Sequence, residues 1–155
     1  GKIEQTNKDT VLAIANGKIF SILLKARDKR LLQDIFRTVL GKQRQYIYEV
    51  FSAMLYILIS NASPKGRIIV DKEYPGHESL IKLNLKNFYG DSGKEIIRNI
   101  EFNLIGKLSP AHDVASRVFQ KKIKPSKIVT IKDIKSIIFP QKKIGYSDIN
   151  GTEGS

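Results

Sequence analysis

Residues 10–25 read TVLAIANGKIFSILLK, and this stretch decides how the fold begins. Two runs rich in β-branched and aromatic residues, 10–15 and 19–25, lie on either side of Asn16-Gly17. That dipeptide favours the two-residue turn that leads one strand directly back along its neighbour. The sequence therefore predicts an antiparallel hairpin in this part of the chain.

After the hairpin, the spacing of apolar residues changes from alternating to helical. This spacing predicts one helix over 27–40, ended by Gly41, and a second, more apolar helix over about 43–60. A segment that contains proline and glycine then predicts a loop over 61–66.

Strand-like and helical patterns alternate through the rest of the chain. The predicted elements are a strand over 67–71, a helix over 78–88, a loop over 90–93, a strand over 99–105, a helix from Ser109 to about Gln120 and a short helix from Thr130 to Ile138. Ser109-Pro110 has the residues of a helix start, and Thr130 with Asp133 resembles a capping box. Strands separated by a helix favour parallel βαβ units, so the expected fold class is α/β, with a mixed sheet flanked by helices.

The 155-residue length fits one domain with a sizeable core. We expect this domain over residues 1–143, with a basic C-terminal extension over 121–143 and a disordered tail over 144–155. The chain has no cysteine, which excludes disulfides, thiolate catalysis and Cys-type zinc sites.

The longest apolar run, residues 46–59, is shorter than a bilayer-spanning helix and contains Glu49. No secretory signal is visible near the beginning of the sequence, where charged residues interrupt any apolar run. We therefore expect a cytoplasmic protein with no membrane partner.

The charge is strongly positive and unevenly distributed. Lys and Arg number 27 against 15 Asp and Glu, and residues 107–143 hold ten basic but only two acidic side chains. Such a surface is typical of proteins that bind polyanions, above all nucleic acid. The predicted contacts are Lys107, Lys121, Lys122, Lys124 and Lys127. The alternative is a solvated basic face without a ligand; acidic lipid is less favoured because no basic amphipathic helix stands free of the core.

Three acidic residues occupy positions where a carboxylate is costly. Glu49 interrupts an apolar helix, Asp71 closes a buried strand, and Asp113 lies in the first turns of the Ser109 helix. Half-buried carboxylates need partners or a metal ion. If the three converge, they would hold Mg²⁺ or Mn²⁺, and two such ions can promote phosphodiester hydrolysis. Taken singly, each has a structural alternative: pairing with Lys or Arg, capping a strand end, or favouring a helix N-terminus.

Further candidates lie next to these acids. Glu73 points the same way as Asp71 in an extended segment and would be an additional metal ligand. His112 is the candidate for activating water or the leaving group. His77 is either a phosphate contact or proton shuttle, or a solvated histidine in a turn.

The segments YIYEVFSA (46–53), RIIVD (67–71) and SPAHDVA (109–115) resemble the motifs of the ribonuclease H-like nuclease superfamily. The resemblance covers residues 10–120 in element order. It implies that the acids hold two magnesium ions and that the protein hydrolyses phosphodiester bonds in nucleic acid. One departure is that Asn16 stands where the family has a first-strand aspartate. Either the residue was altered, another acid such as Asp9 serves in its place, or the domain does not cut.

The expected function is therefore a metal-dependent endonuclease acting on DNA, RNA or a hybrid. Its first alternative is a non-catalytic nucleic-acid-binding domain that keeps the ribonuclease H-like fold. A second alternative is a scaffold within a larger ribonucleoprotein.

Overall fold

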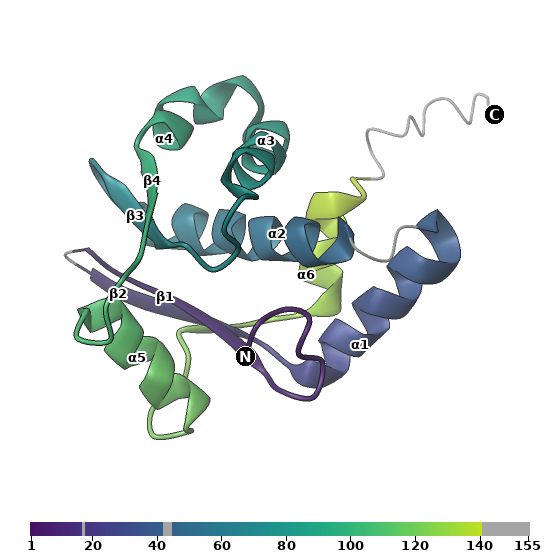
Figure 1. Cartoon of the computed structure of the whole chain (residues 1–155), viewed down its shortest axis with the longest axis horizontal. Helices are drawn as coiled ribbons and strands as arrows, with labels where there is room; N and C mark the ends of the chain where they lie inside the picture. The colour runs from purple at the N-terminus through teal and green to yellow at the C-terminus, as the bar shows by residue number, and fades with distance from the viewer. Residues whose placement is uncertain (17, 42–44, 141–155) are drawn as a thin grey trace.

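The computed structural model describes residues 1–16, 18–41 and 45–140, which form a mixed α/β structure (Figure 1). Its elements are β1 (Thr10–Asn16), β2 (Lys18–Leu24), α1 (Ala26–Ile35), a π-helical turn η1 (Phe36–Leu40), α2 (Gln45–Ala62), β3 (Ile68–Asp71), α3 (Glu78–Tyr89), a 3-10 turn η2 (Gly90–Gly93), α4 (Lys94–Arg98), β4 (Ile100–Asn103), α5 (Pro110–Phe119), β5 (Lys127–Val129) and α6 (Ile131–Ile138).

The predicted hairpin is confirmed. Strands β1 and β2 pair antiparallel, with Thr10 opposite Leu24 and Leu12 opposite Ile22. Gly17 of the predicted turn lies outside the described residues. Strand β5 adds to β2 in parallel, so β1, β2 and β5 form a mixed three-stranded sheet in that order.

The predicted βαβ unit is also confirmed, because β3 and β4 pair in parallel with α3 and α4 between them. This pair is a second sheet: among the described residues, neither strand joins the ladder of β1, β2 and β5. The expectation of a single mixed sheet is therefore only partly met. Alternating apolar residues indicate that a strand exists, but they do not specify its neighbour.

Helix α2 crosses the middle of the molecule, with α3 on one side and the β1–β2 ribbon on the other (Figure 1). It is apolar on most of its circumference and is therefore buried on more than one face. Its fully or nearly buried residues include Val50, Ala53, Met54 and Leu58, which pack in one core with residues of β2, α1 and α3.

Helix α5 lies on the far side of the β1–β2 ribbon from α2 (Figure 1). It begins as predicted: Ser109 is the N-cap, its Oγ accepts from the His112 amide at 3.1 Å, and Pro110 is the first helical residue. Val114 and Val118 are buried and form the inner face of the helix.

The structure differs from the predicted elements in two places. Residues 90–93 form a 3-10 turn that leads into α4 instead of an open loop. Gly93 is required there, because a Cβ at this position would lie 2.2 Å from the Tyr89 Cβ. Strand β5 was not predicted, since three residues are too short for a periodic pattern and their partner strand is about 100 positions earlier in the chain.

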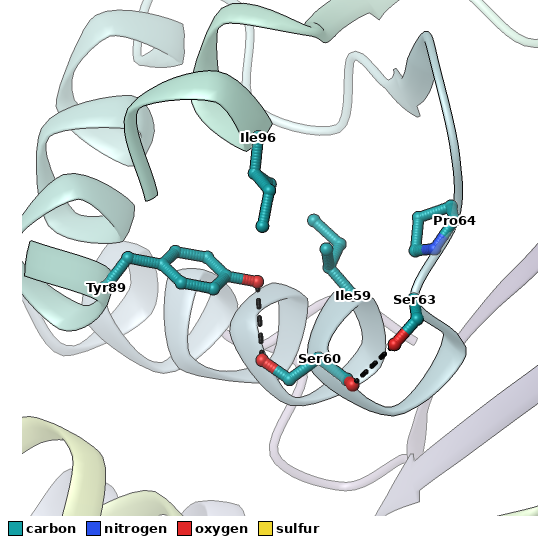
Figure 2. Close-up of a pocket in the computed structure, with 6 residues that line it drawn as sticks. All are labelled: Ile59, Ser60, Ser63, Pro64, Tyr89 and Ile96. Atoms are coloured by element: carbon teal, nitrogen blue, oxygen red, sulfur yellow. Dashed lines mark hydrogen bonds between the residues drawn. The ribbon is translucent and has the colours of Figure 1, made fainter. Parts of the chain in front are cut away.

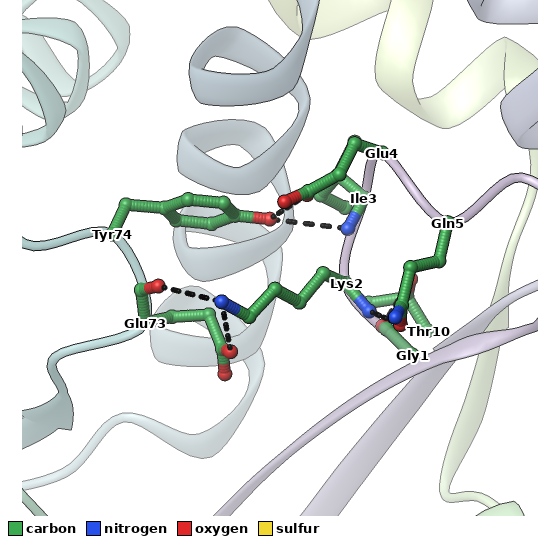
Figure 3. Close-up of polar contacts among 8 residues, drawn as sticks. All are labelled: Gly1, Lys2, Ile3, Glu4, Gln5, Thr10, Glu73 and Tyr74. Atoms are coloured by element: carbon green, nitrogen blue, oxygen red, sulfur yellow. Dashed lines mark hydrogen bonds and ion pairs between the residues drawn. The ribbon is translucent and has the colours of Figure 1, made fainter.

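Residues before β1 are held by contacts to Glu73 and Tyr74, which lie about 70 positions later in the chain (Figure 3). Ile3 is fully buried, and its amide donates to the Tyr74 hydroxyl at 3.1 Å. That hydroxyl in turn donates to Glu4 at 3.0 Å. Burial raises the pKa of Tyr74, so the phenol stays protonated and keeps this hydrogen bond.

Lys29 of α1 has no exposed surface, and it also holds the residues before β1 in place. Its ammonium group donates to the carbonyls of Lys2 and Gln5 at 2.9 and 2.7 Å and to the Thr10 hydroxyl at 2.9 Å. Burial lowers the pKa of Lys29 to about 8, although the carboxylates of Asp9 and Glu4 partly oppose this effect. A buried cation thus links the segment before β1 to the first helix.

Candidate functional site

Glu49 is half-buried on α2, as expected for an acid in an apolar helix. It lines a cavity of about 380 Å³ between α2, α3 and α6, together with Asn84, Asn87 and Ser136. The described residues that line the cavity are partly polar and partly apolar, and no other predicted metal ligand is among them.

Asp71 is half-buried at the C-terminal end of β3, as expected. Its Oδ1 accepts a hydrogen bond from the Ile105 amide at 3.2 Å, so it ties the end of β3 to the segment after β4. Glu73 lies two residues on, and its carboxylate is 3.8 Å from the Lys2 ammonium (Figure 3). In this position Glu73 helps to hold the residues before β1.

Asp113 does not occupy the half-buried position that the sequence predicts. It lies on the outer face of α5, 58% exposed, and forms an ion pair with Arg117 at 3.1 Å. The spacing of four residues places both side chains on the same face of the helix. His112 is exposed next to it. The buried face of α5 is set by Val114 and Val118, which leaves Asp113 toward solvent.

Glu49, Asp71 and Asp113 therefore lie in three different parts of the structure. Among residues 1–16, 18–41 and 45–140, no three Asp, Glu or His side chains lie close enough together to hold a metal ion. Glu49, Asp71, Asp113 and Glu73 are not gathered in one cluster among the described residues, and we derive no reaction step through a metal ion. Metal binding by these residues stays a prediction.

The side chain of Asn16, which stands in place of the first-strand aspartate, lies outside the described part of the chain. The Asp9 carboxylate, the alternative acid, accepts a hydrogen bond from the Ala26 amide at 2.8 Å.

His77 is held by an aromatic neighbour. Its ring stacks on Tyr48 with the ring centres 4.1 Å apart, and its Nε2 lies 3.0 Å from the Tyr48 hydroxyl. Tyr48 also packs edge-on against Tyr74. The His77 ring is therefore half-buried rather than solvated in its turn, and its role as a phosphate contact or proton shuttle stays a prediction.

The basic segment begins in a tight turn at the C-terminal end of α5, residues 120–124, which we call the basic turn. The Lys121 amide donates to the Val118 carbonyl at 3.0 Å, and the Lys122 amide donates to the Arg117 carbonyl at 2.9 Å. These two bonds are the Schellman pattern of a helix end. Lys121 occupies its left-handed position with φ of 62°, where glycine is the usual residue. A lysine therefore occupies a backbone conformation that usually selects glycine, which has no side chain.

The other end of the basic turn is fixed to the mixed sheet. The Ser21 amide donates to the Ser126 hydroxyl at 2.9 Å, and the Ser126 amide donates to the Ser21 hydroxyl at 3.2 Å. Ser21 is buried in β2, and Ser126 directly precedes β5. The basic turn is thus held at both ends, by the helix carbonyls and by this reciprocal pair.

The predicted cationic contacts are largely available at the surface. Lys107, Lys121, Lys122 and Lys124 are exposed, and none belongs to an ion pair within the described part of the chain. Lys127 is half-buried, and its ammonium lies 3.9 Å from Asp133. The structure therefore concentrates unpaired positive charge at the basic turn and at Lys107, near the two ends of α5.

A second cavity, of about 340 Å³, lies where α2 ends (Figure 2). It is lined by Ile59, Ser60, Ser63, Pro64, Tyr89 and Ile96. The Tyr89 hydroxyl lies 3.3 Å from Ser60 Oγ, and burial raises the pKa of this tyrosine. With hydroxyl groups and apolar walls but no charged lining residue, this cavity offers no acid–base pair.

Sequence reasoning did not identify two apolar side chains at the basic turn. Phe119 and Ile123 are 42% and 41% exposed. An alternating run of apolar and basic residues, FQKKIK over 119–124, was the available signal. It could not show that these apolar side chains face outward, since that depends on which face of α5 packs on the sheet.

The fold and the basic turn together define a mixed α/β domain with a cationic surface at one helix end. Comparison with protein-family models, with curated proteins and with solved structures gave no match for this chain. No helix among the described residues is long and apolar enough to cross a membrane.

Proposed function

We propose that this domain binds nucleic acid through the basic turn and Lys107. The observation that carries the proposal is a set of exposed lysines at these positions that form no ion pair with any other described residue. Lysine side chains neutralise phosphates and release the counterions that surround nucleic acid. Because the basic turn is held by Ser126 and by the end of α5, its backbone is already in place before a ligand binds, and only the lysine side chains have to be ordered.

The test is binding of a labelled oligonucleotide as a function of salt. About four phosphate contacts would lower the affinity roughly 100-fold between about 50 and 200 mM salt. Fluorescence anisotropy at several salt concentrations measures this slope. An affinity that does not change with salt would contradict the proposal, because counterion release is then absent.

Metal-dependent hydrolysis of phosphodiester bonds is the second candidate function, in the ribonuclease H-like setting that the sequence motifs suggest. One observation favours it: Asp71 is half-buried at the C-terminal end of a parallel strand, where ligands of α/β folds usually bind. The Ile105 amide also holds one of its oxygens in place.

For this second candidate, wild-type protein with Mg²⁺ or Mn²⁺ is expected to cut labelled single-stranded, duplex or hybrid substrates. Asp71→Asn keeps the side-chain oxygen that faces Ile105 but removes the charge, so cutting should fall by about 100-fold or more while binding is retained. Gel analysis of the products measures cutting. Asp91→Asn is the matched control, because it removes one exposed carboxylate from the 3-10 turn η2. Cutting that survives Asp71→Asn would exclude Asp71 from the site.

A further inference from the structure

The basic turn and the adjoining end of α5 combine two kinds of surface, positively charged and apolar. Phe119 is the last residue of α5 and is 42% exposed, and Ile123 is 41% exposed four residues later. Lys121, Lys122 and Lys124 stand between and beside them, all exposed. The partner of this surface should therefore present both negative charge and apolar area.

The backbone brings these side chains together at the helix end. The amides of Lys122 and Ile123 both point to the Arg117 carbonyl, at 2.9 and 3.4 Å. The chain at Ile123 is thus folded back toward the last turn of α5, where Phe119 lies. The left-handed backbone of Lys121 produces this reversal. A non-glycine residue in this conformation is strained, and such strain is often retained at functional positions.

A single-stranded nucleic acid meets both requirements. Its phosphates match the lysines, and its unpaired bases can stack on an exposed aromatic ring. In a duplex, the base faces are stacked inside the helix and only phosphates and groove edges reach the protein. An anionic membrane also offers charge and apolar area, but the apolar face of α5 is used up by Val114 and Val118 against the sheet.

A second pairing of charge and apolar surface lies before α5. Lys107 is exposed and Leu108 is 99% exposed. The ten residues of α5 span about 15 Å, so one extended strand can reach from Leu108 to the basic turn. Between these ends, Asp113 and Arg117 neutralise each other and add no net charge.

We infer that the basic turn binds single-stranded nucleic acid in preference to duplex, with a base stacked on Phe119 and phosphates held by Lys121, Lys122 and Lys124. This inference rests on the proposed function, nucleic-acid binding by the same surface. It adds the class of nucleic acid and the side chain that selects it.

The experiment compares a single strand of about 16 nucleotides with the duplex of the same sequence, at equal salt. Wild-type protein is expected to bind the single strand at least tenfold more tightly. Phe119→Ala should weaken single-strand binding about tenfold and leave duplex binding unchanged, while Phe119→Tyr, which keeps the ring, should retain the preference. Leu83→Ala, a change at another exposed apolar side chain, on α3, is the matched control. If Phe119→Ala does not fold, Phe119→Leu, which keeps an apolar side chain but removes the ring, serves as the second variant and should also lose the preference for the single strand.

Several outcomes would overturn the inference. Equal or tighter duplex binding that Phe119→Ala leaves unchanged would show that the surface reads phosphates only, and the proposed function would still stand. Failure to bind either oligonucleotide would refute the proposed function itself. Binding to vesicles of phosphatidylserine and phosphatidylcholine, with no oligonucleotide binding and a loss in Phe119→Ala, would assign the surface to a membrane.

Discussion

Replacing Lys121, Lys122 and Lys124 together by glutamine is expected to lower the affinity for nucleic acid about 100-fold at moderate salt. Each lysine at a phosphate contributes to counterion release, so the slope of log affinity against log salt should also decrease by about two to three. These side chains are exposed and belong to no ion pair among the described residues, so the fold should tolerate the change. Anisotropy titrations at several salt concentrations measure both effects.

The control for this experiment keeps the net charge equal. Lys72, Lys86 and Lys94 are also exposed, and glutamine at these positions removes the same three charges elsewhere on the molecule. If both triple variants lose affinity to the same extent, the overall charge of +12 drives binding and the basic turn has no special role. A loss confined to the Lys121, Lys122 and Lys124 variant localises the site.

Lys29→Met is expected to lower the free energy of unfolding by about 2 to 3 kcal/mol near neutral pH. Methionine fills a similar volume but donates no hydrogen bond, so the carbonyls of Lys2 and Gln5 and the Thr10 hydroxyl lose a charged donor. The attachment of residues 1–9 to α1 should weaken most. Urea unfolding followed by circular dichroism measures the stability, and hydrogen exchange shows which segment loosens.

The same lysine predicts how stability depends on pH. Its pKa is about 8 in the folded protein, below its ordinary value of 10.5, so the unfolded chain binds more protons between these values. The free energy of unfolding should therefore rise as the pH increases from about 8 toward 10. Burial raises the pKa values of Tyr46, Tyr74 and Tyr89, which opposes this rise at higher pH, so measurements between pH 8 and about 9.5 are the most informative. In Lys29→Met the rise should be much smaller, and the part that remains is expected from the Gly1 amino group, whose pKa burial also lowers.

A wild-type stability that stays constant over this range would mean that Lys29 is not buried as a charged group. Lys86→Met, a change at an exposed lysine of α3, is the control for removal of a positive charge. Lys86→Met should change the free energy of unfolding by no more than a few tenths of a kcal/mol. It should leave the pH dependence of the stability unchanged.

Local signals in the sequence determined most of the elements. Alternation and turn chemistry predicted β1 and β2, and the residue types at Ser109-Pro110 and at Thr130 predicted the starts of α5 and α6. The Thr130 capping box is present as expected, because its two hydrogen bonds join residues only three positions apart. Positive charge after Lys107 was likewise evident, since exposure is the usual state of lysine.

Tertiary structure decided what these elements form together. Strand β5 exists because β2 offers an edge to residues about 100 positions later, and no local pattern encodes such a pairing. The predicted convergence of Glu49, Asp71 and Asp113 required knowledge of which helix face turns inward, and packing of Val114 and Val118 directs Asp113 to solvent. By itself, then, the sequence determined the hairpin, the helix starts and the basic surface, because they depend on neighbouring residues. Only the tertiary structure decided the two sheets, the burial of Lys29 and the joint exposure of Phe119 and Ile123, because these depend on contacts between distant parts of the chain.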